Sequence, residues 1–374
     1  MKKIILAIDS FKGCLSSAEV EQCVAETIRS VYPQCEIISL PIADGGEGIL
    51  DVLVRTTGGH FITAEAHDPL MRLRKARYGV LGDGKTAVIE MAEISGLPLV
   101  EEESRNPLIT TTYGTGELIA DALKNGYRNL LIGIGGSATN DAGLGMLQAL
   151  GASIFNKNNE SLGYGGRIMN ETAYIDTSKL IPELNEATFT IACDVQNPFC
   201  GPDGAAYVFG KQKGGTPEQL NILDMGMKHL AEIIRIQTGK DIETLPGAGA
   251  AGGLGGCFYA FLNAELKPGI ELMLDAVKFD SFLSGSDLVI TGEGKSDNQT
   301  LQGKVPEGVM KRARKHNVPT LLIAGKIEDT KELEAAGFKK LIQVSPNTLP
   351  LTEAMKPDVA RENIRRTISS LFNR

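Results

Sequence analysis

The sequence predicts an α/β protein of two domains: a doubly wound (Rossmann- or flavodoxin-like) parallel-sheet domain and an inserted mixed α/β domain. Three observations lead to this fold class. Short apolar runs alternate with helical segments at both ends of the 374-residue chain, the middle of the chain carries strands of its own, and the length suits two or three domains. This alternation of strands and helices assigns residues 1–60 and 280–374 to the parallel-sheet domain and residues 61–279 to the insertion.

The elements of the parallel-sheet domain follow in order. An apolar run at 4–9 leads into a helix whose start is marked by Ser16 and Glu19 at capping-box spacing. A helix from about 48 to 55 follows the second strand, and helical segments separate the later strands. The strands after the first are expected at 36–43, 287–292, 320–325 and 340–345.

The insertion has strands expected at 130–135 and 189–195. It also has a helix that begins at Pro217, because Thr216 and Gln219 have capping-box spacing and proline suits the first helical position. The insertion is therefore expected to fold as an α/β domain with its own sheet.

The composition excludes several classes of protein. A formal net charge of -8 argues against a general nucleic-acid-binding surface. The N-terminus has too short an apolar run for a signal peptide, and no run elsewhere reaches membrane-spanning length. The six cysteines show no C-x-x-C spacing, and with only four histidines a His-based metal or triad site is not favoured. We expect a cytoplasmic protein that binds small molecules, with no nucleic-acid or membrane partner; the oligomeric state is left open.

Residues 79–86, GVLGDGKT, fit the phosphate-loop pattern G-x-x-x-x-G-K-[ST] at every fixed position. A phosphate loop must leave a strand and enter a helix, so that backbone N–H groups face the phosphates. Here both flanks favour strands, Gly82-Asp83-Gly84 is a hairpin-turn signal, and no helix cap follows Thr86. We therefore predict a β-hairpin at this place.

The glycine-rich segment GIGGSATND (133–141) has a better context for an anion. It follows an expected strand and enters a helical stretch, so its N–H groups and the side chains of Ser137, Thr139 and Asp141 are candidate phosphate ligands. The alternative is a tight turn with a polar cap, and the residues alone do not decide between the two.

A second glycine-rich segment, GAGAAGGLGG (247–256), permits close backbone approach at Gly252 and Gly253. The partner is either a ligand or another helix, and both interpretations stay open at this point.

Three further loops follow strands of the predicted parallel sheet: DSFKG (9–13), ADGGEG (43–48) and TGEGKSDNQT (291–300). The carboxyl ends of parallel strands line the ligand crevice, so we expect these loops on one edge. They supply glycines, lysines and carboxylates. Carboxylates hold Mg²⁺, lysines neutralise phosphate and an Asp accepts a hydroxyl proton, which is the chemistry of phosphoryl transfer with ATP and Mg²⁺. Hydride transfer favours a G-x-G-x-x-G fingerprint after the first strand, and that fingerprint is absent.

Eight stretches, in family order and spread over nearly the whole chain, resemble a known family. They are DSFKG (9–13), ADGGEG (43–48), AVIEMAEISGL (87–97), RNPLITTTYGTGELI (105–119), GIGGSATNDAGLGMLQALG (133–151), ACDVQNPFCGPDGAAYVFGKQKGG (192–215), GAGAAGGLG (247–255) and DLVITGEGKSDNQTLQGKVPEGV (287–309). Through them the sequence resembles the glycerate kinases of the bacterial type I family, which includes the glycerate 2-kinases. The departures are small: Ala142 stands where the family usually has Gly, Cys14 where it often has Ser, and Lys295-Ser296 where Arg and an apolar residue are more usual.

The resemblance implies ATP-dependent phosphorylation of D-glycerate, typically at the 2-hydroxyl to give 2-phosphoglycerate, by a two-domain enzyme with its active site in the cleft between domains. It does not assign a role to each residue, so we assign roles from placement. Asp194 ends an apolar strand before a turn and suits a base toward a glycerate hydroxyl. Lys12 would bind the glycerate carboxylate or the transferring phosphate, and Asp44 would orient a hydroxyl or hold Mg²⁺; these three are the catalytic candidates.

Glu293 and Asp297 are the metal candidates. The candidates for substrate or phosphate binding are Ser10, Gly45, Gly46, Glu47, Ser137, Thr139, Asp141, Gln212, Lys213, Gly252, Gly253, Gly292 and Lys304. Structural interpretations remain beside these roles: a solvated lysine for Lys12, a cap for Asp44, Glu47 and Asp194, and a solvated loop for Gln212 and Lys213.

Two other functions fit the same sequence. The first is a kinase for another small hydroxy acid, which would differ only in its carboxylate pocket. The second is a non-catalytic sensor of anionic metabolites, which would have lost carboxylates from its loops, whereas Asp44, Glu47, Asp194, Glu293 and Asp297 are all present.

Overall fold

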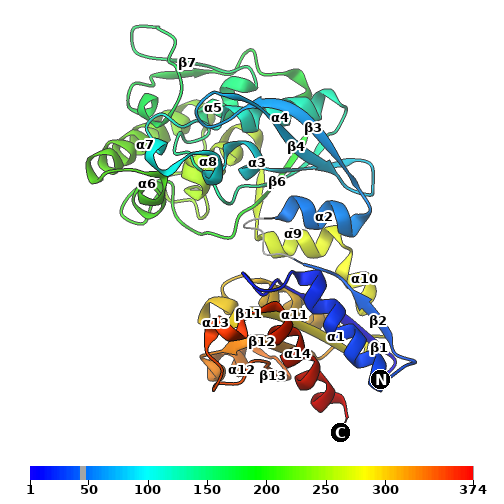
Figure 1. The fold of residues 1–374 in the computed structure, drawn as a ribbon. Coiled ribbons are helices and arrows are strands. Elements are labelled where there is room, and N and C mark those ends of the chain that lie inside the picture. Colours follow the sequence, from blue (N-terminus) through cyan, green and yellow to red (C-terminus); the bar gives the residue numbers. More distant parts are fainter. Residues whose placement is uncertain (43–47, 374) are drawn as a thin grey trace. The chain divides into compact units, whose positions relative to one another are not determined.

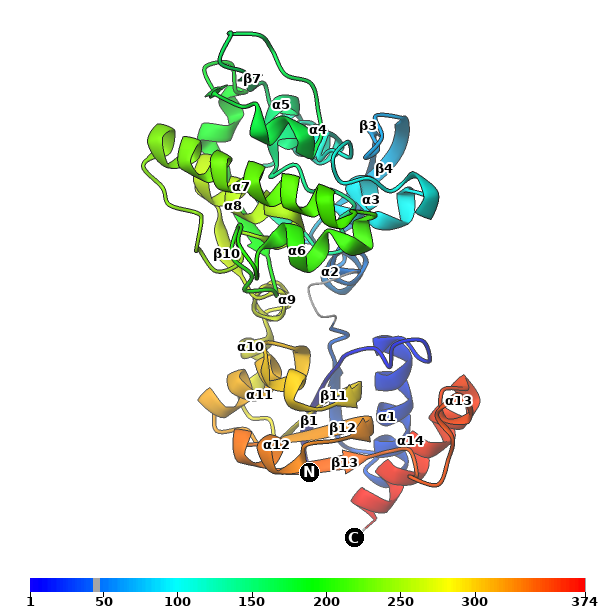
Figure 2. The ribbon, with the colours of Figure 1, turned by 90° about the vertical axis from the view of Figure 1, so that its left-hand side faces the viewer.

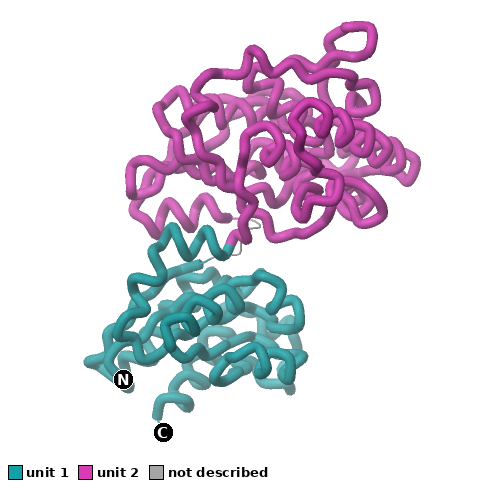
Figure 3. Tube along the Cα trace, turned by 180° about the vertical axis from the view of Figure 1, so that it is seen from behind, with its two compact units in different colours: residues 1–44, 270–374 teal, residues 45–269 magenta. Residues whose placement is uncertain are grey.

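The computed structural model of the protein describes residues 1–42 and 48–373. The chain divides into two compact units: unit 1 is residues 1–44 and 270–374, and unit 2 is residues 45–269 (Figure 1, Figure 3). Each unit has its own main sheet and its own hydrophobic core.

Unit 1 is built on a five-stranded sheet of order β13-β12-β11-β1-β2 in which all neighbours are parallel. Counted within the unit this order is 2-1-3-4-5, the flavodoxin-like doubly wound order, and the strand order reverses between β1 and β11. The parallel sheet predicted from both ends of the chain is confirmed. Its strands are β1 Lys3–Ile8, β2 Glu36–Ser39, β11 Leu288–Ser296, β12 Thr320–Ile327 and β13 Lys340–Gln343.

Helices cover both faces of this sheet. α1 and α14 pack on one face, where Leu6, Ile28 and Ile364 are fully buried, and α11 and α12 pack on the other, where Leu322 and Leu333 are fully buried (Figure 2). The helices are α1 Ser17–Val31, α9 Gly269–Ala276, α10 Phe279–Leu283, α11 Val305–Lys315, α12 Thr330–Ala336, α13 Leu351–Ala354 and α14 Pro357–Phe372. Apolar strands covered on both sides explain why these strands are nearly continuous apolar runs.

The predicted start of α1 is confirmed. The hydroxyl of Ser16 accepts from the backbone N–H of Glu19 at 3.3 Å, and the Glu19 carboxylate accepts from the backbone N–H of Ser16 at 2.9 Å. One turn later the same helix buries Glu21, whose Oε1 accepts from the backbone N–H of Ile8 at 3.0 Å, while Oε2 has no hydrogen-bond partner among the described residues. Burial raises the pKa of Glu21 well above its ordinary value.

This buried carboxyl predicts a pH-dependent stability. The unfolded chain releases the Glu21 proton near the ordinary pKa of 4.5, whereas the folded protein keeps it to higher pH. The free energy of unfolding should therefore fall as pH rises through that window, by at most about 1.4 kcal/mol per pH unit, and Glu21→Gln should lack this slope. Thermal unfolding midpoints measured between pH 5 and 8 test it, with the exposed Glu26→Gln on the same helix as the control. Parallel pH curves for wild type and Glu21→Gln would contradict the prediction.

Unit 2 contains a mixed six-stranded sheet of order β10-β9-β6-β5-β4-β3. β5, β6, β9 and β10 run parallel, and β4 pairs antiparallel with β5 on one side and with β3 on the other. The mixed α/β fold expected of the insertion is thus observed. The strands are β3 His60–His67, β4 Leu73–Val80, β5 Thr86–Glu90, β6 Asn129–Gly133, β9 Thr188–Ala192 and β10 Glu265–Lys267, with β7 Ser153–Phe155 and β8 Tyr174–Asp176 as a separate pair.

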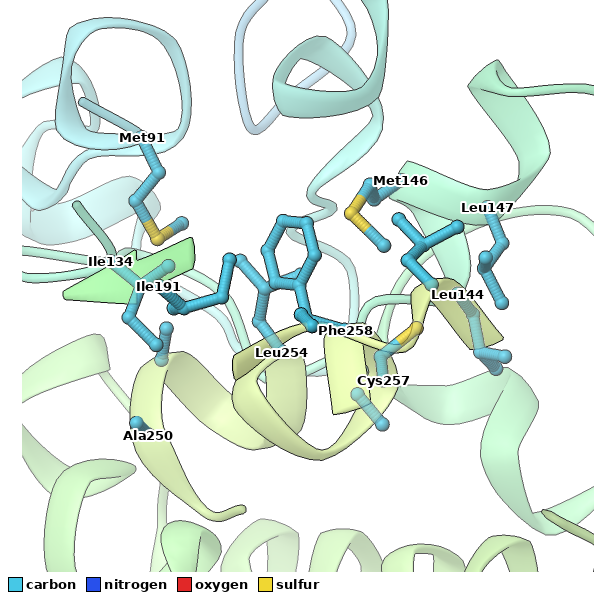
Figure 4. Close-up of a cluster of buried hydrophobic side chains, with 14 of the residues drawn as sticks. Met91, Ile134, Leu144, Met146, Leu147, Ile191, Ala250, Leu254, Cys257 and Phe258 are labelled. Atoms are coloured by element: carbon cyan, nitrogen blue, oxygen red, sulfur yellow. The ribbon is translucent and has the colours of Figure 1, made fainter. Parts of the chain in front are cut away.

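One large apolar core joins helices α3 to α8 of unit 2 to one face of its sheet. Phe258 of α8 lies at the centre of the part shown in Figure 4, with Ile191 of β9 on one side and Met146 of α5 on the other. The helices are α2 Ile49–Thr57, α3 Ala92–Ser95, α4 Tyr113–Lys124, α5 Leu144–Ala149, α6 Ala205–Phe209, α7 Pro217–Thr238 and α8 Ala250–Leu262. The predicted capping box of Thr216 and Gln219 at the start of α7 is confirmed.

Helix α2 belongs to a different unit from the one expected. We assigned it, within residues 1–60, to the parallel-sheet domain, but the structure includes it in unit 2. Leu50 and Val54 pack against β4 at Gly79, where a Cβ atom would lie 2.1 Å from Val54 Cγ2, so only glycine permits this approach. The contact with β4 decides the placement of α2, and the boundaries lie near residues 45 and 270.

The predicted hairpin is confirmed at the phosphate-loop pattern. β4 and β5 pair antiparallel, and the Asp83 carboxylate in the turn accepts from the backbone N–H groups of Lys85 at 2.8 Å and Thr86 at 2.9 Å. Thr86 begins a strand and not a helix. The segment therefore lacks the helix N-terminus that a phosphate loop requires.

Lys85 is exposed in this hairpin, so Lys85→Ala should leave ATP-dependent turnover within about threefold of wild type. In a phosphate loop the lysine neutralises charge on the β- and γ-phosphates, and its loss costs orders of magnitude. Steady-state kinetics of the folded variant measures the difference, and a large loss of activity would show that the loop does hold a nucleotide.

All six cysteines lie among the described residues and none forms a disulfide. Over the same part of the chain, every helix is too short or too polar to cross a membrane.

Candidate active site

A pocket of about 770 Å³ lies at the carboxyl ends of the unit 1 strands. It lies where the strand order reverses between β1 and β11, the position at which doubly wound sheets bind ligands. The structure brings five of the predicted site residues into the lining of this one pocket: Ser10, Lys12, Glu293, Asp297 and Lys304.

The lining of this unit 1 pocket has two chemical halves. One half is charged and contains four lysines together with several carboxylates. The lysines are Lys12, Lys295, Lys304 and Lys326. The other half is apolar and includes Phe11, Leu349, Leu351 and Met355, of which Leu351 remains 69% exposed. A pocket of this size with one charged and one apolar half suits a ligand that carries both phosphate groups and a flat ring.

Glu293 lies at the carboxyl end of β11 and is buried. Its Oε1 accepts from the hydroxyls of Thr300 at 2.6 Å and Ser296 at 3.0 Å, and its Oε2 lies 3.8 Å from Lys304 Nζ. Burial raises the pKa of the Glu293 carboxyl, against the Thr300 hydroxyl and the charge of Lys304, which lower it. The carboxylate is thus held rigidly with one edge toward a lysine.

Lys304 occupies the N-cap position of α11. A cation is unfavourable there, because the helix macrodipole places partial positive charge at its N-terminus. The Nζ–Oε2 distance to Glu293 is also too long for a hydrogen bond. A lysine at a helix N-terminus is compatible with an anion bound beside it.

Mg²⁺ can be tested against the acidic residues of this pocket. No group of three or more His, Cys, Asp or Glu side chains is arranged to hold a metal among residues 1–42 and 48–373. Mg²⁺, however, is usually bound by one or two carboxylates together with water and substrate phosphates. Glu293 and Asp297 both line the pocket, with Asp297 Oδ1 accepting from the N–H of Gln299 at 2.9 Å and Oδ2 lying 3.4 Å from Lys295. This pair fits a phosphate-bridged Mg²⁺ and not an all-protein cage.

A second pocket, of about 540 Å³, lies within unit 2 at the carboxyl ends of β6 and β9. It brings together four more of the predicted residues: Ser137, Asp194, Gln212 and Lys213. Its other lining is largely apolar, so it suits a ligand smaller than a nucleotide.

Asp194 follows β9, which ends at Ala192 and not, as expected, at 195. Its Oδ1 accepts from the backbone N–H of Gly269 at 2.7 Å, which fixes the carboxylate at the rim of the unit 2 pocket. The side chain is exposed, so a ligand in the pocket can reach it.

Lys213 is a buried lysine of the same pocket, 1% exposed. Its Nζ donates to Ser137 Oγ at 2.7 Å and to the carbonyl of Thr139 at 2.6 Å. Burial lowers the pKa of Lys213 to about 7, against the charge of Asp141, which raises it. The solvated-loop alternative for Lys213 is therefore wrong.

Comparison with known proteins decides the family. Residues 4–374 match the model of the glycerate kinase family. The chain belongs to this family. It is 46% identical to glycerate kinase of Bacillus subtilis (strain 168), over 98% of this chain and 95% of that protein. It is 44% identical to glycerate 2-kinase of Escherichia coli (strain K12), over 97% of this chain and 95% of that protein. A crystal structure assigned to glycerate kinase 2 of Salmonella typhimurium LT2 superposes with a TM-score of 0.88 at 42% identity, covering 100% of this chain and 97% of that one. The resemblance to the glycerate kinases, the α/β fold class and the kinase class predicted from the sequence are thus confirmed.

Not every predicted ligand lies in a pocket. Asp141 is fully buried, and its oxygens accept from the hydroxyl of Thr111 at 3.0 Å and the N–H of Thr112 at 2.7 Å, among others. Thr139 is fully buried too. Helix α5 begins only at Leu144, so segment 133–141 does not enter a helix directly. Asp141 and Thr139 are core residues that hold this segment in shape.

Three predicted glycines pack closely against other parts of the protein. A Cβ at Gly252 would lie 2.2 Å from the carbonyl oxygen of Thr139, and one at Gly292 would lie 2.2 Å from that of Ile323. A Cβ at Gly253 would lie 2.8 Å from the side chain of Phe199. At these three positions the structure shows glycines that permit close packing of the protein against itself.

Ala142 has a positive φ of 52°. The left-handed region disfavours any residue with a Cβ, which gives a physical reason for the glycine that this family usually has there.

The predicted residues Asp44, Gly45, Gly46 and Glu47 lie outside the described residues. Their roles stay predictions.

Asp9 and Arg105 are among the pocket residues that the sequence reasoning missed. Asp9 is buried at the end of β1 and lines the unit 1 pocket, and Arg105 lines the unit 2 pocket with its Nε donating to the carbonyl of Val100 at 3.3 Å. Asp9 could have been found, because it opens the DSFKG loop. Arg105 carries no local signal, since only the tertiary fold brings it to β6 and β9.

Proposed function

We propose that this kinase phosphorylates D-glycerate with ATP at the 2-hydroxyl, and that it does so in the cytoplasm. The observation that supports the reaction best is the unit 1 pocket, which combines lysines, carboxylates and an apolar wall at the carboxyl edge of a doubly wound sheet. The named relatives act on glycerate, which supports the choice of acceptor.

In this proposal the unit 1 pocket binds ATP. Lys12 and Lys304 contact the phosphates, and Glu293 and Asp297 would hold Mg²⁺, which would supply neutralisation of phosphate charge. Phe11, Leu351 and Met355 supply an apolar surface for the adenine ring. The pocket volume of about 770 Å³ falls in the range expected for a ligand of this size.

The unit 2 pocket binds glycerate, and Asp194 acts on its hydroxyl. The 2-hydroxyl donates to the Asp194 carboxylate, and its oxygen attacks the γ-phosphorus. A new O–P bond forms while the bond between the γ-phosphorus and the bridging oxygen breaks, ADP leaves, and the hydroxyl proton passes to Asp194. The transition state is loose and demands little proton abstraction, so correct orientation of the hydroxyl contributes more than basicity.

Phosphorus NMR of the product formed from ATP and D-glycerate tests the proposal. We expect a single phosphomonoester whose coupling identifies phosphorylation at the 2-hydroxyl. A 3-phosphate would overturn the position, and no product from glycerate but a product from another hydroxy acid would overturn the substrate. If no acceptor in a wide panel were phosphorylated by ATP, the result would favour the non-catalytic sensor of anionic metabolites.

A further inference from the structure

We propose that Ser137, held by the buried ammonium group of Lys213, and the backbone amides of Gly135 and Gly136 form the binding site for the substrate carboxylate in the unit 2 pocket. The inference rests on the proposed function, because it assigns a specific group of the hydroxy acid to a specific part of the pocket. Lys213 is a positioning residue here, since its buried ammonium group donates to Ser137 and to the carbonyl of Thr139 and acts on the substrate through Ser137.

The direction of the hydrogen bond between Lys213 and Ser137 leaves the Ser137 hydroxyl hydrogen available to a ligand. An ammonium group has only donors, so in the 2.7 Å contact between Lys213 Nζ and Ser137 Oγ the hydroxyl oxygen must accept. The hydroxyl hydrogen of Ser137 then has to donate elsewhere, and Ser137 lines the unit 2 pocket. Polarisation by the adjacent cation makes this O–H a stronger donor to an anion.

The backbone beside Ser137 supplies further donors. The carbonyl of Gly136 accepts from Leu97 at 2.8 Å and the N–H of Ala138 donates to Ser95 at 2.9 Å, which fixes the segment against 95–97. In the described part of the chain the N–H groups of Gly135 and Gly136 have no backbone or side-chain acceptor. Gly136 has a φ of +70°, and successive N–H groups around such a residue form a concave anion-binding nest.

The charge around Lys213 favours an anion as well. Asp141 is the charged group whose field acts on Lys213, and its two oxygens are already engaged by Thr111, Thr112 and the N–H of Gly143. The ammonium group itself contacts only the neutral Ser137 and Thr139. Burial lowers the pKa of Lys213 to about 7, against the charge of Asp141, and a carboxylate bound beside Ser137 would favour the charged form of the lysine.

The anion in question is a carboxylate and not a nucleotide phosphate. Asp194 lines the same pocket, so a phosphate dianion there would face a negative charge, whereas a hydroxy acid offers a hydroxyl donor to Asp194 and a carboxylate to Ser137. Arg105, also in the lining, adds a second cation for the same carboxylate. The pocket therefore offers an acceptor for a hydroxyl group at Asp194 and donors for a carboxylate at Ser137 and Arg105, which are the groups that a small 2-hydroxy acid requires.

Ser137→Ala tests the proposal with the full chain. We expect the KM for D-glycerate to rise about tenfold to a hundredfold, the fold-change that corresponds to loss of one charge-assisted hydrogen bond, while the KM for ATP and the rate with glycerol change less than about twofold. Glycerol shares the hydroxyl groups of glycerate but lacks the carboxylate. Ser104→Ala, an exposed serine outside the pocket, is the matched control.

Lys213→Met should reproduce the glycerate effect, and the double variant should be no worse than the single ones, because the two side chains act as one unit. If Lys213→Met fails to fold, the kinetics of Ser137→Ala still test whether Ser137 binds the substrate carboxylate. A rise in the KM for ATP would show that the anion is a nucleotide phosphate and would overturn the proposal. Equal losses with glycerate and glycerol would also overturn it, since they would indicate a structural role.

Direct binding separates this inference from the proposed function. Calorimetric titration of the wild type with D-glycerate, without nucleotide, should show binding that Ser137→Ala weakens. If glycerate binds in this way but is not phosphorylated, the proposed function fails and the carboxylate site stands. If glycerate is phosphorylated normally and Ser137→Ala binds it as well as wild type does, the carboxylate site fails and the function stands.

Discussion

Asp194→Asn should lower kcat for glycerate phosphorylation by about a hundredfold or more, while the KM for ATP stays within about threefold of wild type. Asparagine keeps the oxygen that accepts from the N–H of Gly269 at 2.7 Å, so the position of the side chain is retained. What is lost is the negative charge that orients the substrate hydroxyl and takes its proton. The effect should therefore appear in the chemical step and not in nucleotide affinity.

The matched control is Asp203→Asn, an exposed aspartate of the loop that follows β9, which should retain kcat within about twofold. Single-turnover kinetics with saturating ATP measures the chemical step directly. A near-normal kcat for Asp194→Asn would contradict the assignment and transfer the role to Asp44 or Asp297.

Local signals in the sequence were sufficient for much of the fold. The apolar runs at both ends predicted the parallel sheet because strands buried on both faces cannot be amphipathic. Ser16 with Glu19, and Thr216 with Gln219, predicted two helix starts because the capping box is a contact between residues three apart. The hairpin at Asp83 was predictable for the same reason, since turn chemistry is local.

What the sequence could not provide are contacts between distant segments. The membership of α2 depends on the fit of Val54 against Gly79, which no local pattern expresses. Lys213 lies in a glycine-rich loop that looks solvated, and only its approach to Ser137 makes it buried. Asp141 shows the reverse error: a carboxylate in a glycine-rich segment suggested a ligand, but hydrogen bonds with Thr111 and Thr112 fix it in the core.

Lys304 is the second residue for which we expect a large effect, and the change to serine separates function from stability. Serine is a favoured N-cap residue and removes a cation from the positive end of the α11 dipole, which stabilises the helix by about 1 kcal/mol. It also leaves the buried Glu293 without the lysine 3.8 Å away, which offsets part of this gain. We therefore expect the melting temperature of Lys304→Ser to stay close to that of wild type.

Activity should respond in the opposite way. If Lys304 contacts the phosphates of ATP, Lys304→Ser should lower kcat/KM for ATP by about a hundredfold or more, because a charge that stabilises the transferring phosphoryl group is lost. Lys326→Ser is the matched control: Lys326 lines the same pocket, but its partner Glu328 keeps a second ion pair with Lys295 at 2.9 Å, so a loss below about threefold is expected. Equal kinetics for the two variants would show that the unit 1 pocket does not use Lys304 for the nucleotide. A stable but inactive Lys304→Ser protein would explain why an unfavourable lysine occupies this helix start: the position is set by the phosphates it binds and not by the helix it begins.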